Sequence, residues 1–335
     1  MQATWIARRV ERWLSEIPAG RIHSRFDSVL NLAWGDHLIT LALPEAGRLP
    51  GGILLDPATV QRGAWPGIQG DPVSWDSTAQ VLRLPGGLAT LGGAIRETRE
   101  PAPLAAIDAS RVIQNVQTLV RLAQLGAKGE LVPLLGAFGL RGSGAGGARA
   151  LTQVSGTWAD QGAPEGSGTL GAPDPAAIAA WQELQLLTRA LAAGDGPALV
   201  AVARPMLGRG EGLTPGWDDL LLGLIATIWF AGPALPDRIR CASQTLADAL
   251  AEAAPTRTTA ISANYLQLAA DGGWSERLAD ATLALLGASG PALVAPIQRL
   301  LAFGHSSGHD TAVGLALGSV TILHLLSEGS PHEEP

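Results

Sequence analysis

The pattern of hydrophobic and polar residues changes near residue 105, and each side of that point predicts a different kind of structure. Between about residues 21 and 97, short apolar runs such as Leu38–Leu43 alternate with turn residues, which is typical of β-strands. Beyond it, apolar residues such as Val112, Val116 and Leu119 recur at helical spacing. We therefore expect an α+β protein with a β-rich N-terminal domain, residues 1–104, and a mainly α-helical C-terminal domain, residues 105–335.

Local signals place individual elements in each domain. Residues 1–16 mix Trp5, Val10 and Leu14 with arginines and glutamate, which predicts an amphipathic N-terminal helix. Gly35-Asp36 between two apolar runs predicts a β-hairpin. In the C-terminal domain, periodicity predicts helices over 175–193, 197–207, 220–230, 237–253, 258–271, 276–286, 291–303 and 308–327. The segment 139–175 is dense in Gly, Ala, Ser and Pro and predicts a long mobile loop, with a lid over a site as the alternative.

Composition narrows the function classes. The chain has 335 residues, a formal net charge of −7, a pI near 5.4 and no basic cluster interleaved with aromatics, which argues against nucleic-acid binding. Cys241 is the only cysteine, so an intrachain disulfide is impossible and a reducing cytoplasm is the simplest location. The longest apolar stretch, residues 220–235, contains Gly and Pro and is too short to span a bilayer, so we expect no membrane segment.

The segment 208–219 carries the strongest functional signal. It has glycines at alternate positions, namely Gly208, Gly210 and Gly212, which allow close backbone approach to a ligand. Thr214 followed by Pro215 predicts an N-cap and a first helical residue. A helix start presents unpaired N–H groups and a partial positive charge, so a phosphate or carboxylate ligand is the first hypothesis.

Two adjacent carboxylates, Asp218 and Asp219, follow that helix start. Neighbouring residues on a helix diverge by about 100°, so at most one of them points at a ligand above the helix end. The other could hold a metal or the neighbouring loop. The alternative is an ordinary capped helix whose aspartates complement the helix dipole. The segment is not a Walker A loop, because no Lys-Ser/Thr follows the glycines, and Lys128 is the only lysine in the chain.

A second helix start of the same kind lies at residues 303–314. Ser306 or Ser307 can cap the helix, and Asp310 falls in its first turn. Gly314 and Gly318 lie four residues apart and would let another helix pack closely.

His305 and His309 in this segment have the i, i+4 spacing that can place two imidazoles on one helix face, as in zinc sites. The intervening Ser-Ser-Gly indicates instead that His305 precedes the helix. A single histidine acting as a general acid or base is then the better hypothesis.

The third helix start follows Pro255. Arg257 could pair with a carboxylate or phosphate, Thr258 opens the predicted helix and Ser262 lies inside it. The alternative is a solvated arginine beside capping threonines. Three such starts in one helical domain would form a dipole-lined anion site if they converged on one pocket.

These three segments, in this order, resemble the AllH-type subunit family of oxamate carbamoyltransferase. That family has a Gly-x-Gly-x-Gly-Leu-Thr-Pro-Ser-Gly-Asp-Asp run, a Thr-rich segment and a late Ser-Gly-x-Asp; here they are residues 208–219, 256–268 and 307–310. Residues 20–24 are also similar, so the likeness covers most of the chain. Gly216-Trp217 stands where the family has Ser-Gly, so one hydroxyl is missing from the loop.

The resemblance implies a subunit that works with other carbamoyltransferase subunits in purine-ring breakdown, where oxalurate and phosphate yield oxamate and carbamoyl phosphate. In this hypothesis the N–H groups of Gly210, Gly212 and Thr214 hold the anion. The role of Arg257 is to neutralise developing charge. Asp218 or Asp219 orients a metal or the substrate amide, and His305 or His309 shuttles a proton.

Two alternatives stay open. The first is a non-catalytic subunit whose pocket binds a regulatory anion or helps to build a complex. The second is a metal-dependent hydrolase in which Asp218, Asp219 and Asp310 hold a divalent ion such as Mg²⁺ through hard oxygen ligands.

Overall fold

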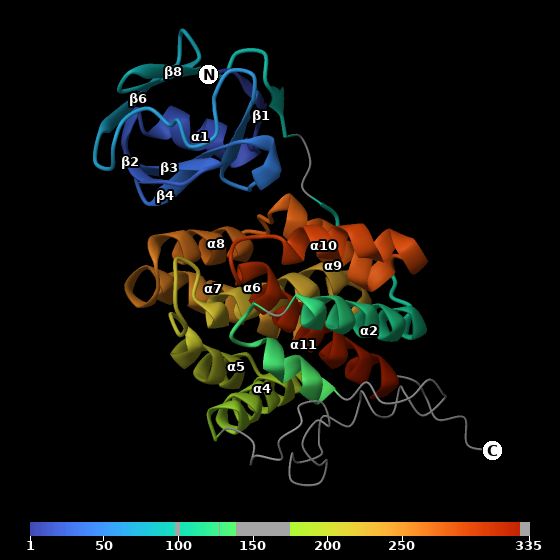
Figure 1. Cartoon of the computed structure of the whole chain (residues 1–335). Helices are drawn as coiled ribbons and strands as arrows, with labels where there is room; N and C mark the ends of the chain where they lie inside the picture. The colour runs from blue at the N-terminus through green and yellow to red at the C-terminus, as the bar shows by residue number, and fades with distance from the viewer. Residues whose placement is uncertain (98–100, 127, 139–174, 329–335) are drawn as a thin grey trace, which may run out of the picture. The chain divides into compact units, whose positions relative to one another are not determined.

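The chain folds into two compact units, one of strands and one of helices (Figure 1). The computed structural model describes residues 1–97, 101–126, 128–138 and 175–328. One unit holds residues 1–101 with 273–277, and the other holds residues 102–272 with 278–335. The predicted α+β class is therefore confirmed. The predicted glycine-rich loop lies outside the described residues, apart from its last position, Pro175.

The N-terminal unit is built on one nine-stranded sheet with the order β8-β7-β6-β2-β3-β4-β5-β1-β9. Its strands are β1 (Ala3–Ile6), β2 (Ala19–Arg25), β3 (Val29–Trp34), β4 (His37–Ala42), β5 (Gly52–Leu55), β6 (Pro72–Asp76), β7 (Val81–Leu84), β8 (Gly87–Thr90) and β9 (Ile95–Arg96). A bridge between Gln2 and Thr90 joins the chain just before β1 to the end of β8, so the sheet curls back towards itself. Helix α1 (Arg8–Glu16) buries Val10, Trp13 and Leu14, and the 3₁₀ turn η1 (Pro44–Ala46) follows β4.

The predicted helix over residues 1–16 is wrong in its first part. Residues 3–6 form β1, whose burial alternates from Ala3 (buried) to Thr4 (exposed) to Trp5 (buried) before the buried Ile6. Pairing with β5 and β9 supplies the hydrogen bonds of this strand, a long-range contribution that local periodicity does not contain. The predicted hairpin is confirmed, because β3 and β4 pair antiparallel up to Trp34 and His37 around Gly35, whose φ of 60° suits the turn.

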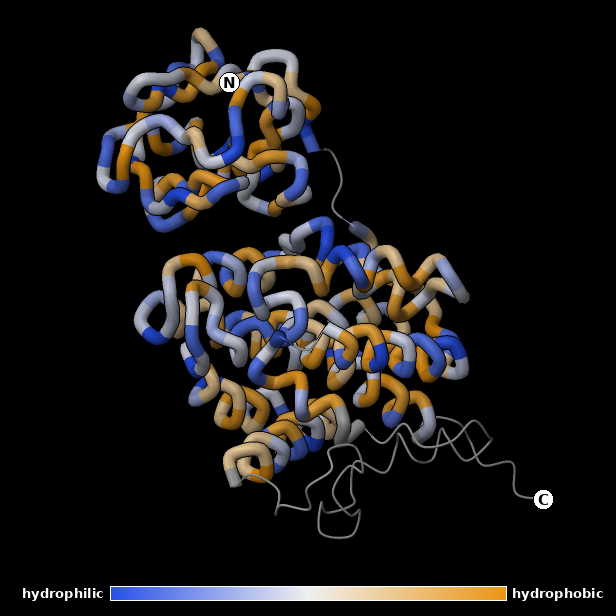
Figure 2. The backbone as a smooth tube through the Cα atoms, in the orientation of Figure 1, coloured by the Kyte–Doolittle hydropathy of each residue, from blue (hydrophilic) through white to orange (hydrophobic). Residues whose placement is uncertain are grey.

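The second unit is helical, and hydrophobic segments are spread through both units (Figure 2). Its helices are α2 (Ala109–Leu125), α4 (Pro175–Ala193), α5 (Gly196–Ala203), α6 (Gly216–Ala231), α7 (Asp237–Arg257), α8 (Ala260–Ala270), α9 (Glu276–Gly287), α10 (Val294–Leu301) and α11 (Ser307–Glu328). Short 3₁₀ turns are η2 (Val132–Phe138), η3 (Arg204–Met206), η4 (Gly232–Ala234) and η5 (Gly290–Leu293). The predicted helices all have counterparts, although 197–207 and 291–303 each include a 3₁₀ turn.

Helices α6 and α11 form the centre of this unit and touch through their backbones. A Cβ atom added at Gly314 would lie 2.0 Å from Leu220 O, and one at Gly223 would lie 2.3 Å from Thr311 O. A Cβ at Gly318 would lie 2.7 Å from the Cβ of Thr227. The predicted close packing at Gly314 and Gly318 is confirmed, and Gly223 supplies the matching surface on α6.

Helix α11 is long and apolar enough to resemble a membrane span over residues 307–327. However, 83% of its most apolar window is buried inside the structure. Burial of this kind is the pattern of a central core helix, and α6 is its main partner.

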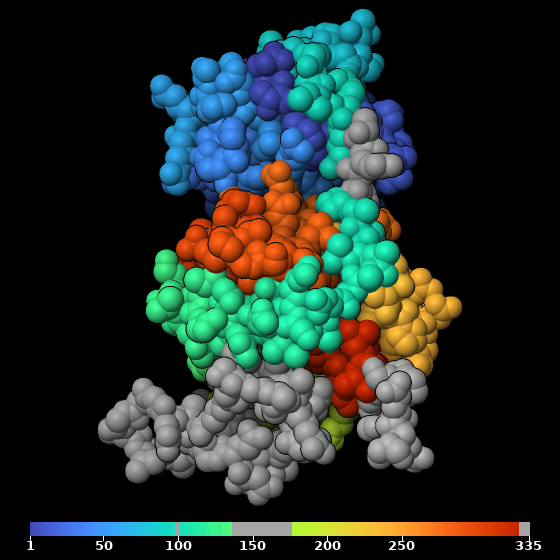
Figure 3. Space-filling view, turned by 90° about the vertical axis from the view of Figure 1, so that its right-hand side faces the viewer, coloured from blue at the N-terminus to red at the C-terminus, as the bar shows by residue number. Residues whose placement is uncertain are grey.

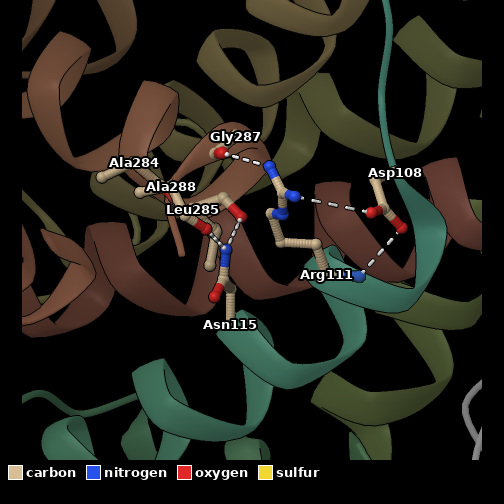
Figure 4. A network of polar contacts seen from close by, with 7 residues as sticks. All are labelled: Asp108, Arg111, Asn115, Ala284, Leu285, Gly287 and Ala288. Carbon is tan, nitrogen blue, oxygen red and sulfur yellow. Dashed lines mark hydrogen bonds and ion pairs between the residues drawn. The ribbon is translucent and has the colours of Figure 1, made fainter. Parts of the chain in front are cut away.

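Helix α2 lies along one face of the helical unit, between α10 and α11 (Figure 3). Its buried Asn115 donates to the carbonyl oxygens of Leu285 and Ala288 at 2.9 Å each, which satisfies acceptors at the C-terminal end of α9 (Figure 4). Arg111 donates to Gly287 O at 3.1 Å, and Asp108 caps α2 at the N–H of Arg111. These bonds fix α2, and therefore the start of the loop that follows it.

Replacing Gly314 by alanine tests the α6–α11 contact. Alanine normally favours a helix, by up to about 1 kcal/mol over glycine. Here its methyl group overlaps Leu220 O, so we expect Gly314→Ala to lower the free energy of unfolding by about 1–3 kcal/mol in urea denaturation. Gly232→Ala is the control, because its Cβ would meet only the Arg240 side chain, with Cδ at 3.5 Å and Cγ at 3.9 Å. An equal effect of both variants would contradict the contact.

Candidate functional site

The three predicted segments converge in the helical unit, and we call residues 208–219, 256–262 and 305–311 the three-loop site. The hydroxyls of Thr214 and Ser307 share a hydrogen bond, which joins the start of α6 to the start of α11. Thr259 Oγ1 donates to Leu213 O at 2.5 Å, which joins the turn between α7 and α8 to the glycine-rich loop. Sequence segments almost a hundred residues apart therefore form one cluster.

Asp218 holds two of these segments together. It is 1% exposed, and its Oδ1 accepts the N–H of Gly208 at 2.8 Å. Its Oδ2 accepts the hydroxyls of Thr258 and Ser262, the latter at 2.7 Å. Both oxygens are thus satisfied by protein donors, so the role of Asp218 in this structure is to fix the glycine-rich loop against the α7–α8 turn.

Asp219 points to the other side of α6 and has a different environment. It is 5% exposed, it interacts with the hydroxyls of Ser307 and Thr214, and its Oδ2 has no hydrogen-bond partner in the described part of the chain. Burial raises its pKa well above the ordinary value, assisted by the charges of Asp310 and Asp218, while the two hydroxyls oppose the rise. Asp219 therefore holds its proton more tightly than an ordinary aspartic acid does.

The glycines of the first loop serve different purposes. Gly208, Gly210 and Gly212 have φ values of 75°, 111° and 91°, in the region that favours glycine. A Cβ at Gly208 would also lie 2.1 Å from Arg257 O, and one at Gly210 would lie 2.2 Å from Glu130 Oε1. A Cβ at Gly212 would meet nothing within 4 Å, so of the three loop glycines only Gly212 is open at its Cα.

Two predicted helix-start roles are corrected. Thr214 is not an N-cap: α6 begins at Gly216 after the extended Pro215, and the Thr214 hydroxyl bonds to Ser307 instead. Thr258 does not open α8, because its hydroxyl donates a hydrogen bond to Asp218. Thr259 caps the helix instead, by accepting the N–H of Ser262.

Arg257, predicted to pair with a carboxylate or phosphate, precedes α8. It is exposed in the last turn of α7, and within the described ranges no carboxylate pairs with its guanidinium. A cation at a helix C-terminus complements the helix dipole there.

The two histidines do not share a helix face. His305 is exposed and precedes α11, as the Ser-Ser-Gly spacing predicts, whereas His309 is 4% exposed inside the first turn. Burial lowers the pKa of His309, and the charge of Lys128 lowers it further. In the part of the chain that is described, no three His, Cys, Asp or Glu residues are grouped to hold a metal ion.

Asp310 anchors the loop that follows α2. Its Oδ1 accepts the N–H of Leu131 at 3.0 Å, and the residue is 1% exposed. Burial raises the pKa of Asp310 to about 6; the Leu131 N–H and Ser306 hydroxyl lower it, and the charge of Glu130 raises it. Ser306 thus contacts the side chain of Asp310, and its carbonyl accepts the N–H groups of His309 and Asp310.

Sequence reasoning missed Glu130. Its carboxylate lies against Gly210 and Gly216, and the N–H of Gly216 donates to it. Burial raises its pKa, as does the charge of Glu211, while Arg209 and the Gly216 N–H oppose the rise. The sequence signal is Lys128-Gly129-Glu130, two charged residues around a glycine directly after a helix. This pattern shows that charged side chains are present but not which residues they contact.

Trp217 occupies the position where the chain departs from the family pattern. It is 5% exposed, and the guanidinium of Arg209 lies 4.1 Å from the centre of its ring. Arg209 also pairs with Glu183 at 2.8 Å. A Cβ at Gly216 would lie 2.5 Å from Glu130 Oε1, so a serine there requires Glu130 to move. Gly216 and Trp217 therefore suit the local packing of this chain.

Comparison with known proteins finds two family models that match the chain. A family model described as oxamate carbamoyltransferase subunit AllH matches residues 206–319, which include all three loops. A model described as the AllH family N-terminal domain matches residues 2–94, which include most of the sheet. No solved structure matches the chain.

The raised pKa of Asp310 predicts a pH-dependent stability. Its carboxyl ionises at about 6 in the folded protein against an ordinary value of 3.8. The folded state therefore binds more protons across this window, so the contribution of Asp310 to stability falls as the pH rises from about 4 to about 6. We expect Asp310→Asn, which still accepts the Leu131 N–H, to reduce that fall in urea unfolding measured across the window. Parallel pH profiles would contradict the assignment.

Proposed function

Because the chain belongs to the AllH family of oxamate carbamoyltransferase subunits, we propose that it is a subunit of a carbamoyltransferase that converts oxalurate and phosphate to oxamate and carbamoyl phosphate. The observation that carries the proposal is the hydrogen bond between Thr214 and Ser307, with the Asp218 contacts beside it. These bonds gather three helix ends of the family-matched region into one cluster of polar groups, which supports a site for a small polar ligand.

Free backbone donors support an anion at the glycine-rich loop. The N–H groups of Gly210, Gly212 and Thr214 have no hydrogen-bond partner among the residues that the structure describes. They precede the N-terminus of α6, where the helix dipole adds a partial positive charge. In the proposal these groups bind phosphate or the substrate carboxylate, and the exposed Arg257 supplies a full positive charge.

Asp219 supplies the proton transfer. A phosphate oxygen attacks the carbamoyl carbon of oxalurate, the bond from that carbon to the amide nitrogen breaks, and the departing nitrogen takes up a proton. Asp219 is suited to donate that proton because its pKa is raised by burial. It regains a proton from the phosphate hydroxyl, so the net change moves one proton from phosphate to oxamate.

The other residues have supporting roles in this proposal. Asp218 positions the loop and does not touch the reacting atoms, since its oxygens accept three protein hydrogen bonds. Ser307 and Thr214 hold Asp219 in place. His309, whose pKa is lowered by burial and by the charge of Lys128, serves as a proton relay in this proposal. Other subunits of the enzyme complete the assembly.

Asp219→Asn tests the chemical role. With the complete set of subunits, we expect formation of carbamoyl phosphate to fall by about 10²–10⁴-fold, the usual contribution of a general acid, with little change in the midpoint of thermal unfolding. Asp218→Asn is the matched comparison: it disturbs three hydrogen bonds and should lower the unfolding midpoint. Full turnover by Asp219→Asn would refute the role of Asp219, and assays of the chain with and without its partners separate a catalytic from a non-catalytic subunit.

A further inference from the structure

The carboxylate of Glu130 lies at the beginning of α6, next to the loop that the proposal assigns to substrate. A Cβ at Gly210 would be 2.2 Å from Glu130 Oε1, and one at Gly216 would be 2.5 Å from the same atom. The N–H of Gly216 donates to this carboxylate. A ligand on the N–H group of Gly210 therefore has a protein carboxylate as its neighbour.

The neighbouring helix start holds Glu130 in this position. A Cβ at Gly129 would lie 2.4 Å from Asp310 Oδ1, and the N–H of Leu131 donates to that oxygen at 3.0 Å. The residues on both sides of Glu130 are thus packed against α11. Arg209, the cation that opposes the charge of Glu130, also pairs with Glu183 and covers Trp217. Arg209 is therefore shared among Glu130, Glu183 and Trp217.

Two buried polar atoms beside this loop indicate that a polar ligand belongs there. Asp219 Oδ2 and His309 Nδ1 have no hydrogen-bond partner within the described residues, and their residues are 5% and 4% exposed. Buried polar atoms in folded proteins are nearly always paired, and each unpaired one needs an explanation. Asp219 lies in the first turn of α6, and His309 lies against Gly126 and Gly129 of the loop that carries Glu130.

We propose that Glu130 is a specificity-determining residue of the three-loop site, which selects a ligand with an amide or carbamoyl N–H group over a simple dianion. A carboxylate accepts hydrogen bonds from N–H donors and repels a second carboxylate placed in the same position. Such discrimination combines an attractive contact with a repulsive one. The inference rests on the proposed function, because it concerns the substrate of that same site.

Oxamate and oxalate are a matched pair of ligands for the test, since they have similar size and differ in an amide against a carboxylate. We expect the full-length chain to bind oxamate about tenfold or more tightly than oxalate in titration calorimetry, a difference of about 1.4 kcal/mol. Glu130→Gln keeps the side-chain length and removes the charge, so it should abolish most of this preference by strengthening the binding of oxalate. Glu130→Asp, which shortens the side chain but keeps its charge, should retain part of the preference.

Glu211→Gln is the control. It removes the same charge from an exposed residue, and the charge of Glu211 raises the pKa of Glu130. Glu130→Gln with an unchanged oxamate preference would overturn the role of Glu130 and leave the proposed function standing. An equal loss of preference in Glu211→Gln would reduce the effect to general charge and would also overturn it. Failure of oxamate and oxalate to bind the wild-type chain and Glu130→Gln, with the complete set of subunits present, would overturn both proposals. Thermal unfolding of each variant confirms that it is folded.

Discussion

The backbone contact between α6 and α11 is the constraint on which the rest of the helical unit depends. Gly223 lies seven residues after the start of α6, and Gly314 lies seven residues after the start of α11. Because the two helices touch at the same depth, about two turns from each start, their N-terminal ends come together. Thr214 and Ser307 then fall within hydrogen-bond distance. A side chain at either glycine would separate the helices and move both ends of the site.

The adjacent aspartates show how one helix start can serve structure and chemistry together. The turn of α6 sends Asp218 towards the hydroxyls of Thr258 and Ser262, and sends Asp219 towards Ser307. The first is satisfied and holds the loop in place; the second is buried with an unpaired oxygen and a raised pKa. The surroundings of Asp219 thus raise its pKa, and a shifted pKa on a rigid support is the arrangement expected where acid–base chemistry takes place.

Much of the fold could be predicted because its signals are local. Helical spacing located α2 and α7, Gly35-Asp36 located a hairpin, and Gly314 with Gly318 indicated close helix packing. The wrong and missed predictions have a common cause, which is long-range contact. Strand β1, the partner of the Thr214 hydroxyl and the destination of Glu130 all depend on residues distant in sequence. The same holds for Thr258, whose hydroxyl could cap a helix locally but bonds to Asp218. Local patterns show which donors and acceptors exist, whereas tertiary packing decides how they pair.

The central claim is that three separate helix ends form one ligand site. Titration of the isotope-labelled chain with oxamate, followed by amide resonances, measures this directly at Gly212 in the first loop, Thr259 in the second and Ser307 in the third. The account predicts that all three resonances shift and saturate with a single dissociation constant. Shifts confined to one segment, or different dissociation constants for the three, would contradict it.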